Sequence, residues 1–279
     1  MPRLFCLGLG YTALALARRL QAEGWQIGGT CREPDRAAAL RAAGIDAVVT
    51  PADPDRLIAD ATHLLASVPP DASGDPALAL WGPAITRHPG LAWAGYLSTT
   101  GVYGDRDGGW VDESSPLEPT GERGRRRVEA EAAWSALLPG VPVHLFRLAG
   151  IYGPGRSALD TVRAGRAQRV VKPGQVFSRV HVDDIAQVLA ASIARPRPGA
   201  IYNVCDDNPA PPDEVIAYAC ALLGVEPPPE MPFDQAPLSD MARSFYADNK
   251  RVANGLIKTE LGVRLTYPDY RAGLKALLG

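Results

Sequence analysis

The segment from Leu4 to Ala13 constrains the fold of this chain more than any other stretch. It begins with the apolar run Leu4-Phe5-Cys6-Leu7, which is too short for a helix and typical of a buried parallel strand. Gly8-x-Gly10-x-x-Ala13 follows directly, and apolar residues then recur at helical spacing as far as Leu20. A strand, a glycine turn and a helix in this order are the context that a dinucleotide-binding loop requires.

Each small residue of this loop has an expected role. Gly8 makes the tight turn, Gly10 lets the backbone approach a pyrophosphate, and Ala13 lets the helix pack closely on the strand. The free N–H groups and the positive dipole end of the helix face the phosphates. An ordinary strand–turn–helix with incidental glycines is the alternative. The residues expected to bind the cofactor here, and at the end of the fourth strand, are Gly8, Leu9, Gly10, Tyr11, Thr12, Ser67 and Val68.

Length and composition narrow the class of protein. The chain has 279 residues, enough for one large α/β domain or one domain with a smaller lobe. Its net charge of −2 gives no electrostatic reason to expect a nucleic-acid or membrane partner. Four cysteines without CxxC spacing argue against a metal site and a disulfide framework. We expect a cytoplasmic protein without a signal peptide, acting on a small-molecule substrate, with a homodimer left open.

Strands and helices alternate along the first hundred residues. Strands are predicted near 4–7, 25–30, 47–49, 63–68 and 91–98, with helices between them, including one over 76–87. This alternation implies right-handed βαβ units and a parallel, doubly wound α/β sheet. Further on, helices are expected over 122–137, 185–193, 212–223 and 249–261. Asp183 or Asp184 is expected to cap the second of these, and residues 226–237 to form a proline-rich loop.

The end of the second strand indicates which nicotinamide cofactor would bind. An acidic residue there binds the ribose 2′-hydroxyl, whereas a basic residue favours the 2′-phosphate. Arg32 occupies this position and Arg36 lies one helical turn further on, although Glu33 is adjacent. The prediction is therefore NADP(H) in preference to NAD(H), the alternative being that Arg32 is a solvated loop charge.

Five segments in a fixed order carry a family resemblance. They are the glycine loop, Ser98-Thr99-Thr100-Gly101-Val102-Tyr103-Gly104, Phe146–Gly155, Arg179–Ala186 and Ile201–Val204. This set resembles the extended short-chain dehydrogenase/reductases, the NAD-dependent epimerase/dehydratase-like superfamily. The resemblance runs from the glycine loop to at least Leu223. It implies a Rossmann-type sheet with a small C-terminal substrate lobe and NAD(P) as cofactor.

The resemblance also implies domain bounds. Residues 1–155, with return segments at about 179–206, would form the NAD(P)-binding Rossmann domain. Residues of about 156–178 and 207–279 would form the smaller substrate lobe.

The family's catalytic set is only partly matched. Its Ser or Thr before the Val-Tyr-Gly turn falls on Thr99, which would orient the substrate oxygen and contact the cofactor. Its Tyr-x-x-x-Lys falls on Arg123 and Arg127. Arg127 could replace the lysine as a positive charge near the ribose, but a guanidinium stays protonated and cannot replace the tyrosine as a proton shuttle. The chain therefore resembles an atypical subgroup that lacks the tyrosine.

Other side chains are weaker candidates. Tyr103 and Tyr152 are predicted at strand ends and could act as acids, although packing is the simpler role for each. The literal Tyr246-x-x-x-Lys250 lies in the expected substrate lobe, out of its motif context. Arg123, Arg156 and His181 are the candidate substrate contacts; the alternatives are a solvated helix start for Arg123 and a hydrogen-bonded structural histidine for His181.

Three functions remain compatible with the sequence. The first is an NADP(H)-dependent oxidoreductase acting on a small carbonyl, hydroxyl or sugar-like substrate, with Thr99, Arg127 and a non-standard acid (Tyr103, Tyr152 or water). The second is a non-catalytic NAD(P)-binding sensor or regulator, suggested by arginine at both the Tyr and Lys positions. The third is a sugar-nucleotide-type epimerase or dehydratase, suggested by the family resemblance alone.

Overall fold

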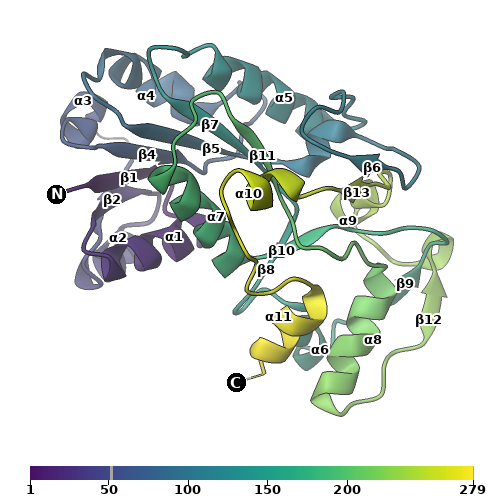
Figure 1. Cartoon of the computed structure of the whole chain (residues 1–279). Coiled ribbons are helices and arrows are strands. Elements are labelled where there is room, and N and C mark those ends of the chain that lie inside the picture. The colour runs from purple at the N-terminus through teal and green to yellow at the C-terminus, as the bar shows by residue number, and fades with distance from the viewer. Residues whose placement is uncertain (51–52, 279) are drawn as a thin grey trace.

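Seven parallel strands form the central sheet of the computed structural model, which describes residues 1–50 and 53–278 (Figure 1). Their order across the sheet is β11-β7-β5-β4-β1-β2-β3. Every neighbouring pair is parallel. The bounds are β1 Arg3–Leu7, β2 Gln26–Cys31, β3 Asp46–Val49, β4 His63–Ala66, β5 Trp93–Thr99, β7 Val143–Leu148 and β11 Ile201–Val204. The predicted Rossmann-type, doubly wound α/β fold is confirmed.

Helices cover both faces of this sheet (Figure 1). One face carries α1 Tyr11–Ala22, α2 Pro34–Ala42 and α7 Val182–Ala194. The other face carries α3 Pro54–Ile58, α4 Pro76–Arg87 and α5 Glu122–Ser135. Both layers arise because each strand runs between buried faces, so its apolar residues point alternately to one helix layer and the other.

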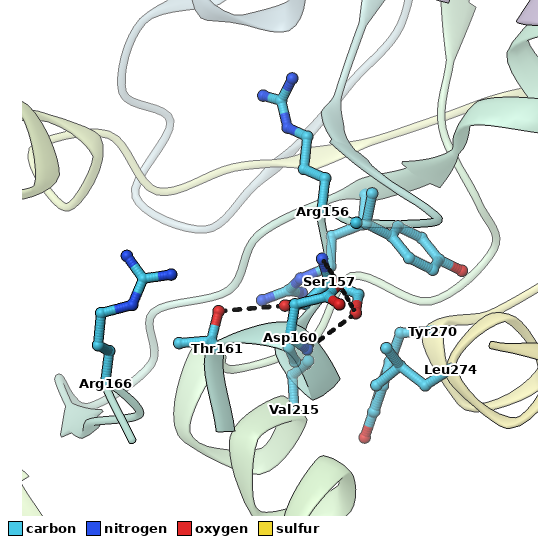
Figure 2. Close-up of a pocket in the computed structure, with 12 residues that line it drawn as sticks. Arg156, Ser157, Asp160, Thr161, Arg166, Val215, Tyr270 and Leu274 are labelled. Carbon is cyan, nitrogen blue, oxygen red and sulfur yellow. Dashed lines mark hydrogen bonds between the residues drawn. The ribbon is translucent and has the colours of Figure 1, made fainter. Parts of the chain in front are cut away.

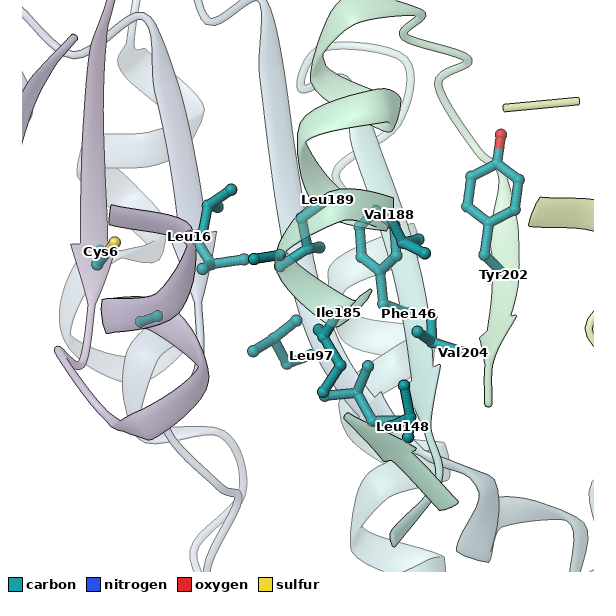
Figure 3. Packing of buried hydrophobic residues seen from close by; sticks show 14 of the residues in the cluster. Cys6, Leu16, Leu97, Phe146, Leu148, Ile185, Val188, Leu189, Tyr202 and Val204 are labelled. Atoms are coloured by element: carbon teal, nitrogen blue, oxygen red, sulfur yellow. The ribbon is translucent and has the colours of Figure 1, made fainter. Parts of the chain in front are cut away.

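Strand β1 shows this alternation directly. Leu4 and Cys6 belong to the apolar cluster under α1 and α7, whereas Phe5 and Leu7 belong to the cluster under α3, α4 and α5. Figure 3 shows the first cluster, in which α7 presents Ile185, Val188 and Leu189. The N-terminal apolar run is thus buried on both faces, as a central parallel strand must be.

A smaller lobe forms around three helices in the C-terminal half: α6 Ala158–Arg163, α8 Pro212–Leu223 and α11 Tyr270–Ala276. Short strand pairs connect it to the rest: β8 Gly150–Tyr152 with β10 Arg179–His181, β9 Arg169–Val171 with β12 Glu230–Pro232, and β6 Trp110–Val111 with β13 Arg251–Val252. The remaining elements are α9 Asp240–Phe245, α10 Gly255–Thr259, and the 3₁₀ turns η1 Thr100–Tyr103 and η2 Phe233–Gln235. The predicted boundary between domain and lobe stays a prediction.

Three expectations about the C-terminal half are wrong. The helix predicted over 249–261 is instead the strand β13 followed by the short helix α10. The proline-rich segment 226–237 contains strand β12, which pairs with β9. Helix α7 begins three residues early and is capped by His181, whose Nδ1 accepts the N–H of Asp183 at 3.2 Å.

Asp184 has a different role from the predicted cap. It is buried, and its two oxygens accept the N–H groups of Thr266 and Tyr267 at 2.7 and 3.0 Å. The carboxylate therefore holds the segment leading into α11 in place.

No helix among residues 1–50 and 53–278 has the length and apolarity needed to cross a bilayer.

Candidate cofactor and active site

The order of the strands in the sheet reverses direction between β1 and β4. Strands β2 and β3 extend the sheet on one side of β1, whereas β4, β5, β7 and β11 extend it on the other. In open parallel sheets, ligands bind beyond the carboxyl ends of the strands at such a reversal point. The residues that follow β1 and β4 there are Gly8 and Ser67, so the glycine loop lies at the expected ligand site.

Gly8 is required by the conformation of this turn. Its φ is +95°, and a Cβ on it would lie 2.9 Å from Val68 Cγ2 and 3.1 Å from Ser67 Oγ. Its N–H donates to Thr30 Oγ1 at 2.9 Å, and its carbonyl accepts the Ser67 hydroxyl at 2.6 Å. The structure thus brings the predicted residues Ser67 and Val68 against the loop.

Gly10 differs from Gly8 in a way that indicates a ligand. Its φ of −81° suits any residue, and the nearest atom to a Cβ on it is Ser67 Oγ at 3.9 Å. Nothing among the described residues needs a glycine here, so the open face is available to a group brought close to the backbone. The cradle therefore fits a dinucleotide pyrophosphate.

The N-terminus of α1 lies in the same place. Gly10 is its N-cap and offers no side-chain hydrogen bond, and the first turn carries no acidic residue. The N–H groups of Tyr11 and Thr12 belong to this first turn, where an α-helix supplies no internal acceptor. Leu9 is buried, and its N–H donates to the Thr30 carbonyl at 2.7 Å. The helix terminus thus keeps donors and a positive dipole end for an anion.

Two arginines flank the loop on the β2 side. Arg32 follows β2 and has a side chain that is 90% exposed, with Glu33 Oε1 3.9 Å from its Nε. Arg36, on α2, donates through Nη2 to the Leu9 carbonyl at 2.8 Å. Arg32 is therefore free to meet a ligand, whereas Arg36 also fixes the loop backbone. The sequence indicated Arg36 as a neighbouring charge but gave no sign of this contact.

At the carboxyl end of β5, two neighbouring hydroxyls are used differently. Ser98 is buried and donates to Glu131 Oε1 at 2.5 Å. Thr99 is half-buried, and its Oγ1 accepts the N–H of Gly101 at 3.1 Å as the cap of η1. Among the described residues, the Thr99 hydroxyl donates to no acceptor, so its proton is available to a substrate oxygen.

The two arginines at the family's Tyr and Lys positions face different surroundings. Arg127 is half-buried and donates from Nη1 to the Leu97 carbonyl at 2.6 Å and to the Tyr96 hydroxyl at 3.1 Å. Arg123 is exposed, with its guanidinium carbon 5.4 Å from the ring centroid of Phe245. Arg127 thus supplies positive charge at the end of β5, while Arg123 contacts α9.

Tyr103 belongs to a buried polar network. Its hydroxyl donates to Asn203 Oδ1 at 2.7 Å and accepts from Arg147 Nη1 at 2.9 Å. Arg147 in turn pairs with the buried Glu131 at 2.8 Å. Burial raises the pKa of Tyr103, and both hydrogen-bonding directions of its hydroxyl are occupied inside the protein. Nothing in the sequence indicated the partners Glu131, Arg147 and Asn203.

Tyr152 and His181 lie together on the neighbouring pair β8–β10. Tyr152 is buried and donates to the Asp269 carbonyl at 3.4 Å, and burial raises its pKa far above the usual value. The His181 ring is buried between Tyr152 and Tyr267, and this burial lowers its pKa. The structure therefore places both side chains at the junction with the lobe, where their rings pack against other aromatic rings.

Arg156 stands between the lobe and the glycine loop. Its guanidinium carbon lies 5.8 Å from the ring centroid of Tyr11, whose hydroxyl donates to the Pro154 carbonyl at 3.1 Å. Arg156 also lines a cavity of about 430 Å³ in the lobe, shown in Figure 2. The predicted substrate contact thus lies beside the first residue of α1.

Tyr246 and Lys250, which form the literal Tyr-x-x-x-Lys, are both largely buried. Lys250 Nζ donates to the Gly104 carbonyl at 2.7 Å and to Asp248 Oδ2 at 3.1 Å. Burial lowers the pKa of Lys250. These contacts hold the segment before β13 against the loop that follows η1.

No group of three or more metal-ligating side chains occurs in residues 1–50 and 53–278.

The fold is that of the extended short-chain dehydrogenase/reductases of the epimerase/dehydratase-like class, with the glycine loop at the reversal point of the sheet. Comparison with known proteins narrows this class. The chain is 32% identical to Protein YeeZ of Escherichia coli (strain K12), over 96% of this chain and 97% of that protein. The chain therefore belongs to the YeeZ family. No protein-family model matches it.

Solved structures agree on the fold. A conserved protein of unknown function from Silicibacter pomeroyi shares 57% identity and superposes with a TM-score of 0.93, over 99% of this chain and 98% of that one. A dTDP-glucose 4,6-dehydratase from Bacillus anthracis in complex with NAD gives 0.79 at 16% identity, covering 100% and 96%. The human epimerase family protein SDR39U1 with NADPH gives 0.77 at 18% identity, covering 99% of each chain. The last two resemble this chain in fold alone.

Proposed function

We propose that the chain binds a nicotinamide dinucleotide at Gly8–Thr12 and acts as an oxidoreductase on a small carbonyl, hydroxyl or sugar-like substrate. The observation that supports this most is the open face of Gly10 at the uncapped N-terminus of α1. It lies at the reversal point of the sheet, where such ligands bind. The fold-level neighbours that carry NAD or NADPH agree with this choice of ligand.

NADP(H) is the cofactor that the charges favour. The exposed Arg32 and the loop-anchoring Arg36 provide two guanidiniums at the end of β2, where the adenosine ribose of a dinucleotide lies in this type of fold. A guanidinium pairs well with a phosphate dianion. Glu33 and Asp35, the two carboxylates between these arginines, oppose this preference.

At the strand end, Thr99 and Arg127 are the side chains we assign to the reaction. A nicotinamide cofactor bound in the loop supplies or accepts a hydride. The Thr99 hydroxyl would donate a hydrogen bond to the substrate oxygen and so orient it, because its own oxygen is already held by Gly101 N–H. Arg127 would provide positive charge beside the ribose. Without the family's tyrosine, we expect turnover about 10²- to 10⁴-fold slower than acid-assisted catalysis.

A non-catalytic cofactor-binding sensor is the second candidate, and one observation favours it. The polar side chains near the end of β5 donate hydrogen bonds to other groups of the protein. These side chains are Ser98, Tyr103 and Arg127. The epimerase or dehydratase function remains a prediction from the family resemblance.

Titration with NADPH and NADH tests the binding proposal. We expect NADPH to bind more tightly, and Arg32→Ala to weaken NADPH by roughly tenfold while leaving NADH within about twofold. The matched control is Arg19→Ala, because Arg19 is a half-exposed arginine that pairs with Glu23 at the far end of α1. Equal loss for both cofactors, or none for either, would refute the assignment of Arg32 to the 2′-phosphate.

Turnover separates the candidate functions. Carbonyl compounds and nucleotide sugars would be screened with each cofactor, and any activity compared between the parent protein and Thr99→Val. Loss of turnover with unchanged cofactor affinity would support the oxidoreductase. Cofactor binding without turnover would favour the sensor. Tightly retained, copurifying cofactor would favour the epimerase or dehydratase.

A further inference from the structure

The cavity in the C-terminal lobe is separate from the glycine loop and has walls of unusual charge. It lies among α6, α8, α11 and β10 and has a volume of about 430 Å³, which is within the range of small-molecule sites. Three arginines line it: Arg156, Arg166 and Arg179. None of them forms an ion pair with a carboxylate of residues 1–50 and 53–278.

The one carboxylate on the wall is already used. Asp160 Oδ2 accepts both the N–H and the hydroxyl of Ser157, at 2.9 and 2.6 Å, in the capping box of α6. Figure 2 shows this pair in the middle of the wall, with Arg156 and Arg166 extending away on different sides of it. The lining therefore carries an excess of positive charge.

Arg179 is the decisive member of this group. Its Nη1 donates to the carbonyls of Phe177 and Ala210 at 2.8 and 2.9 Å. Its Nε and Nη2 have no acceptor in the described part of the chain, and Arg179 as a whole is only half-buried. Burial lowers the pKa of this guanidinium. A charge held in such surroundings is normally paired.

The nearest acidic side chain does not supply that partner. Asp206 is buried and influences Arg179 electrostatically, but the two form no ion pair within 4.0 Å among the described contacts. Burial raises the pKa of Asp206 to about 8, so its carboxyl group is largely protonated at neutral pH. The positive charge of Arg179 is thus left for a ligand to balance.

The opposite wall is apolar and aromatic. Val215 of α8 and Leu274 of α11 line it, and Tyr270 stands beside them (Figure 2). Such a surface suits the carbon body of a small molecule, while guanidinium N–H groups match the oxygens of a phosphate. Three arginines against one carboxylate leave a net positive charge that suits a phosphate dianion better than a singly charged carboxylate.

We propose that this cavity binds the phosphate group of a small phosphorylated molecule, with Arg179 and Arg166 holding the phosphate and Val215, Tyr270 and Leu274 seating the carbon body. The site is additional to the dinucleotide loop and does not depend on the proposed oxidoreductase function. Arg156 connects the two, because its guanidinium carbon lies 5.8 Å from the ring centroid of Tyr11 at the start of α1.

Calorimetric titration of the full chain, saturated with NADPH so that the glycine loop is occupied, tests the proposal. The probes are inorganic phosphate and glucose 6-phosphate, with glucose and acetate as unphosphorylated counterparts. We expect both phosphates to bind and both counterparts to fail. Binding of acetate as tightly as phosphate would overturn the assignment of ligand class.

Variants locate the binding. Arg179→Gln should weaken glucose 6-phosphate at least tenfold, and Arg166→Gln, at the exposed rim, roughly threefold to tenfold. Arg163→Gln is the matched control, because Arg163 is an exposed arginine at the end of α6, three residues before Arg166, that does not line the cavity. If Arg179→Gln does not fold, the affinity of Arg166→Gln for glucose 6-phosphate decides the test.

Two outcomes would overturn the site. One is phosphate binding that is unchanged in Arg166→Gln and in a folded Arg179→Gln. The other is binding that is lost in Gly10→Ala but kept in both arginine variants, because the phosphate would then occupy the glycine loop. Failure of NADPH to bind the parent protein would refute the proposed function only, and the same titrations without NADPH would still test the cavity.

Discussion

The glycine loop and the carboxyl end of β5 lie on the same edge of the sheet, but they use their polar groups in opposite ways. Around Gly10 the loop leaves an open face beside a helix N-terminus without a side-chain cap, and the Arg32 side chain is exposed to solvent. Around Ser98 the side chains bond mainly to one another, through Glu131, Arg147, Tyr103 and Asn203. One region is organised for a ligand, and the other is largely organised for the fold.

This contrast explains how the chain can retain a cofactor site while lacking the family's tyrosine. A pyrophosphate is held by backbone N–H groups and a helix terminus, which survive side-chain replacement. Proton transfer depends on one correctly placed acid, which is lost with a single substitution. Binding is therefore the more robust half of the site, and the substitutions below test the contrast from its largest expected effect to its smallest.

Replacing Arg147 should have the largest effect. Arg147→Met leaves Glu131 as an unpaired charge with a side chain only 4% exposed, so the free energy of unfolding should fall by about 3–5 kcal/mol. Urea denaturation would measure this. Arg126→Met, which breaks the exposed pair with Glu122, should change stability little. Similar small losses for both variants would mean that the strand-end network is not structural.

A residue at the amino end of the strands, away from both regions, allows a control measurement of stability against pH. His144, near the start of β7, is fully buried, and burial lowers its pKa to about 4. Between pH 6.5 and 4 the unfolded chain binds a proton that the folded chain excludes, so stability is complete above 6.5 and falls as the pH is lowered. The loss is on the order of 3 kcal/mol for this residue.

Denaturation midpoints across this pH range would test the prediction, with His144→Phe as comparison. His63, whose pKa burial also lowers to about 4, contributes in the same direction. The slope in the variant should therefore be reduced rather than abolished. An unchanged slope would mean that His144 does not titrate as its burial predicts.

Most of the fold could be predicted from the sequence, because short apolar runs and helical spacing are local patterns. The segment from Leu4 to Leu20 predicted a strand, turn and helix that the structure confirms. The C-terminal half was harder, since β12 and β13 are strands of three and two residues whose existence depends on distant partners. The cap of α7 was misplaced because an imidazole nitrogen, rather than a nearby carboxylate, accepts the N–H.

The contacts of the candidate site also differ in how far they could be predicted from local sequence. The contact of Ser67 with Gly8 follows from strand order and could be anticipated from the motif. The environments of Tyr103 and Arg179 depend on Asn203 and Ala210, which lie 100 and 31 positions away in the chain and are brought close only by folding. The proposed catalytic and binding roles of these positions stay predictions.

Gly10→Ala tests whether the open face is a ligand site. A methyl group fits the conformation and meets only Ser67 Oγ at 3.9 Å, so stability should change by less than about 1 kcal/mol. Cofactor affinity should nevertheless fall at least tenfold, because the methyl group occupies the space of the pyrophosphate. Gly8→Ala is the contrasting variant: its φ of +95° should cost about 1–3 kcal/mol of stability as well. Unchanged cofactor affinity in Gly10→Ala would contradict the site.

Arg36→Met separates loop anchoring from phosphate recognition. Loss of the 2.8 Å hydrogen bond to the Leu9 carbonyl should weaken NADPH and NADH alike, by roughly threefold to tenfold. Arg41→Met is the matched control on α2, since Arg41 donates to the Ala47 carbonyl instead. If only NADPH is weakened, Arg36 contacts the 2′-phosphate itself and the anchoring role is minor.

The smallest expected effect is at Thr99, whose hydroxyl oxygen accepts a hydrogen bond within the protein while its proton is available to a ligand. Thr99→Val keeps the shape but removes the acceptor for Gly101 N–H, so unfolding free energy should fall by about 0.5–1.5 kcal/mol, whereas Thr99→Ser should retain most of it. Cofactor affinity should stay within about twofold in both variants. A loss of affinity in Thr99→Val that Thr99→Ser restores would show that this hydroxyl binds the cofactor directly. The strand end would then share the ligand-directed character of the glycine loop, and the contrast between the two regions would move to Ser98.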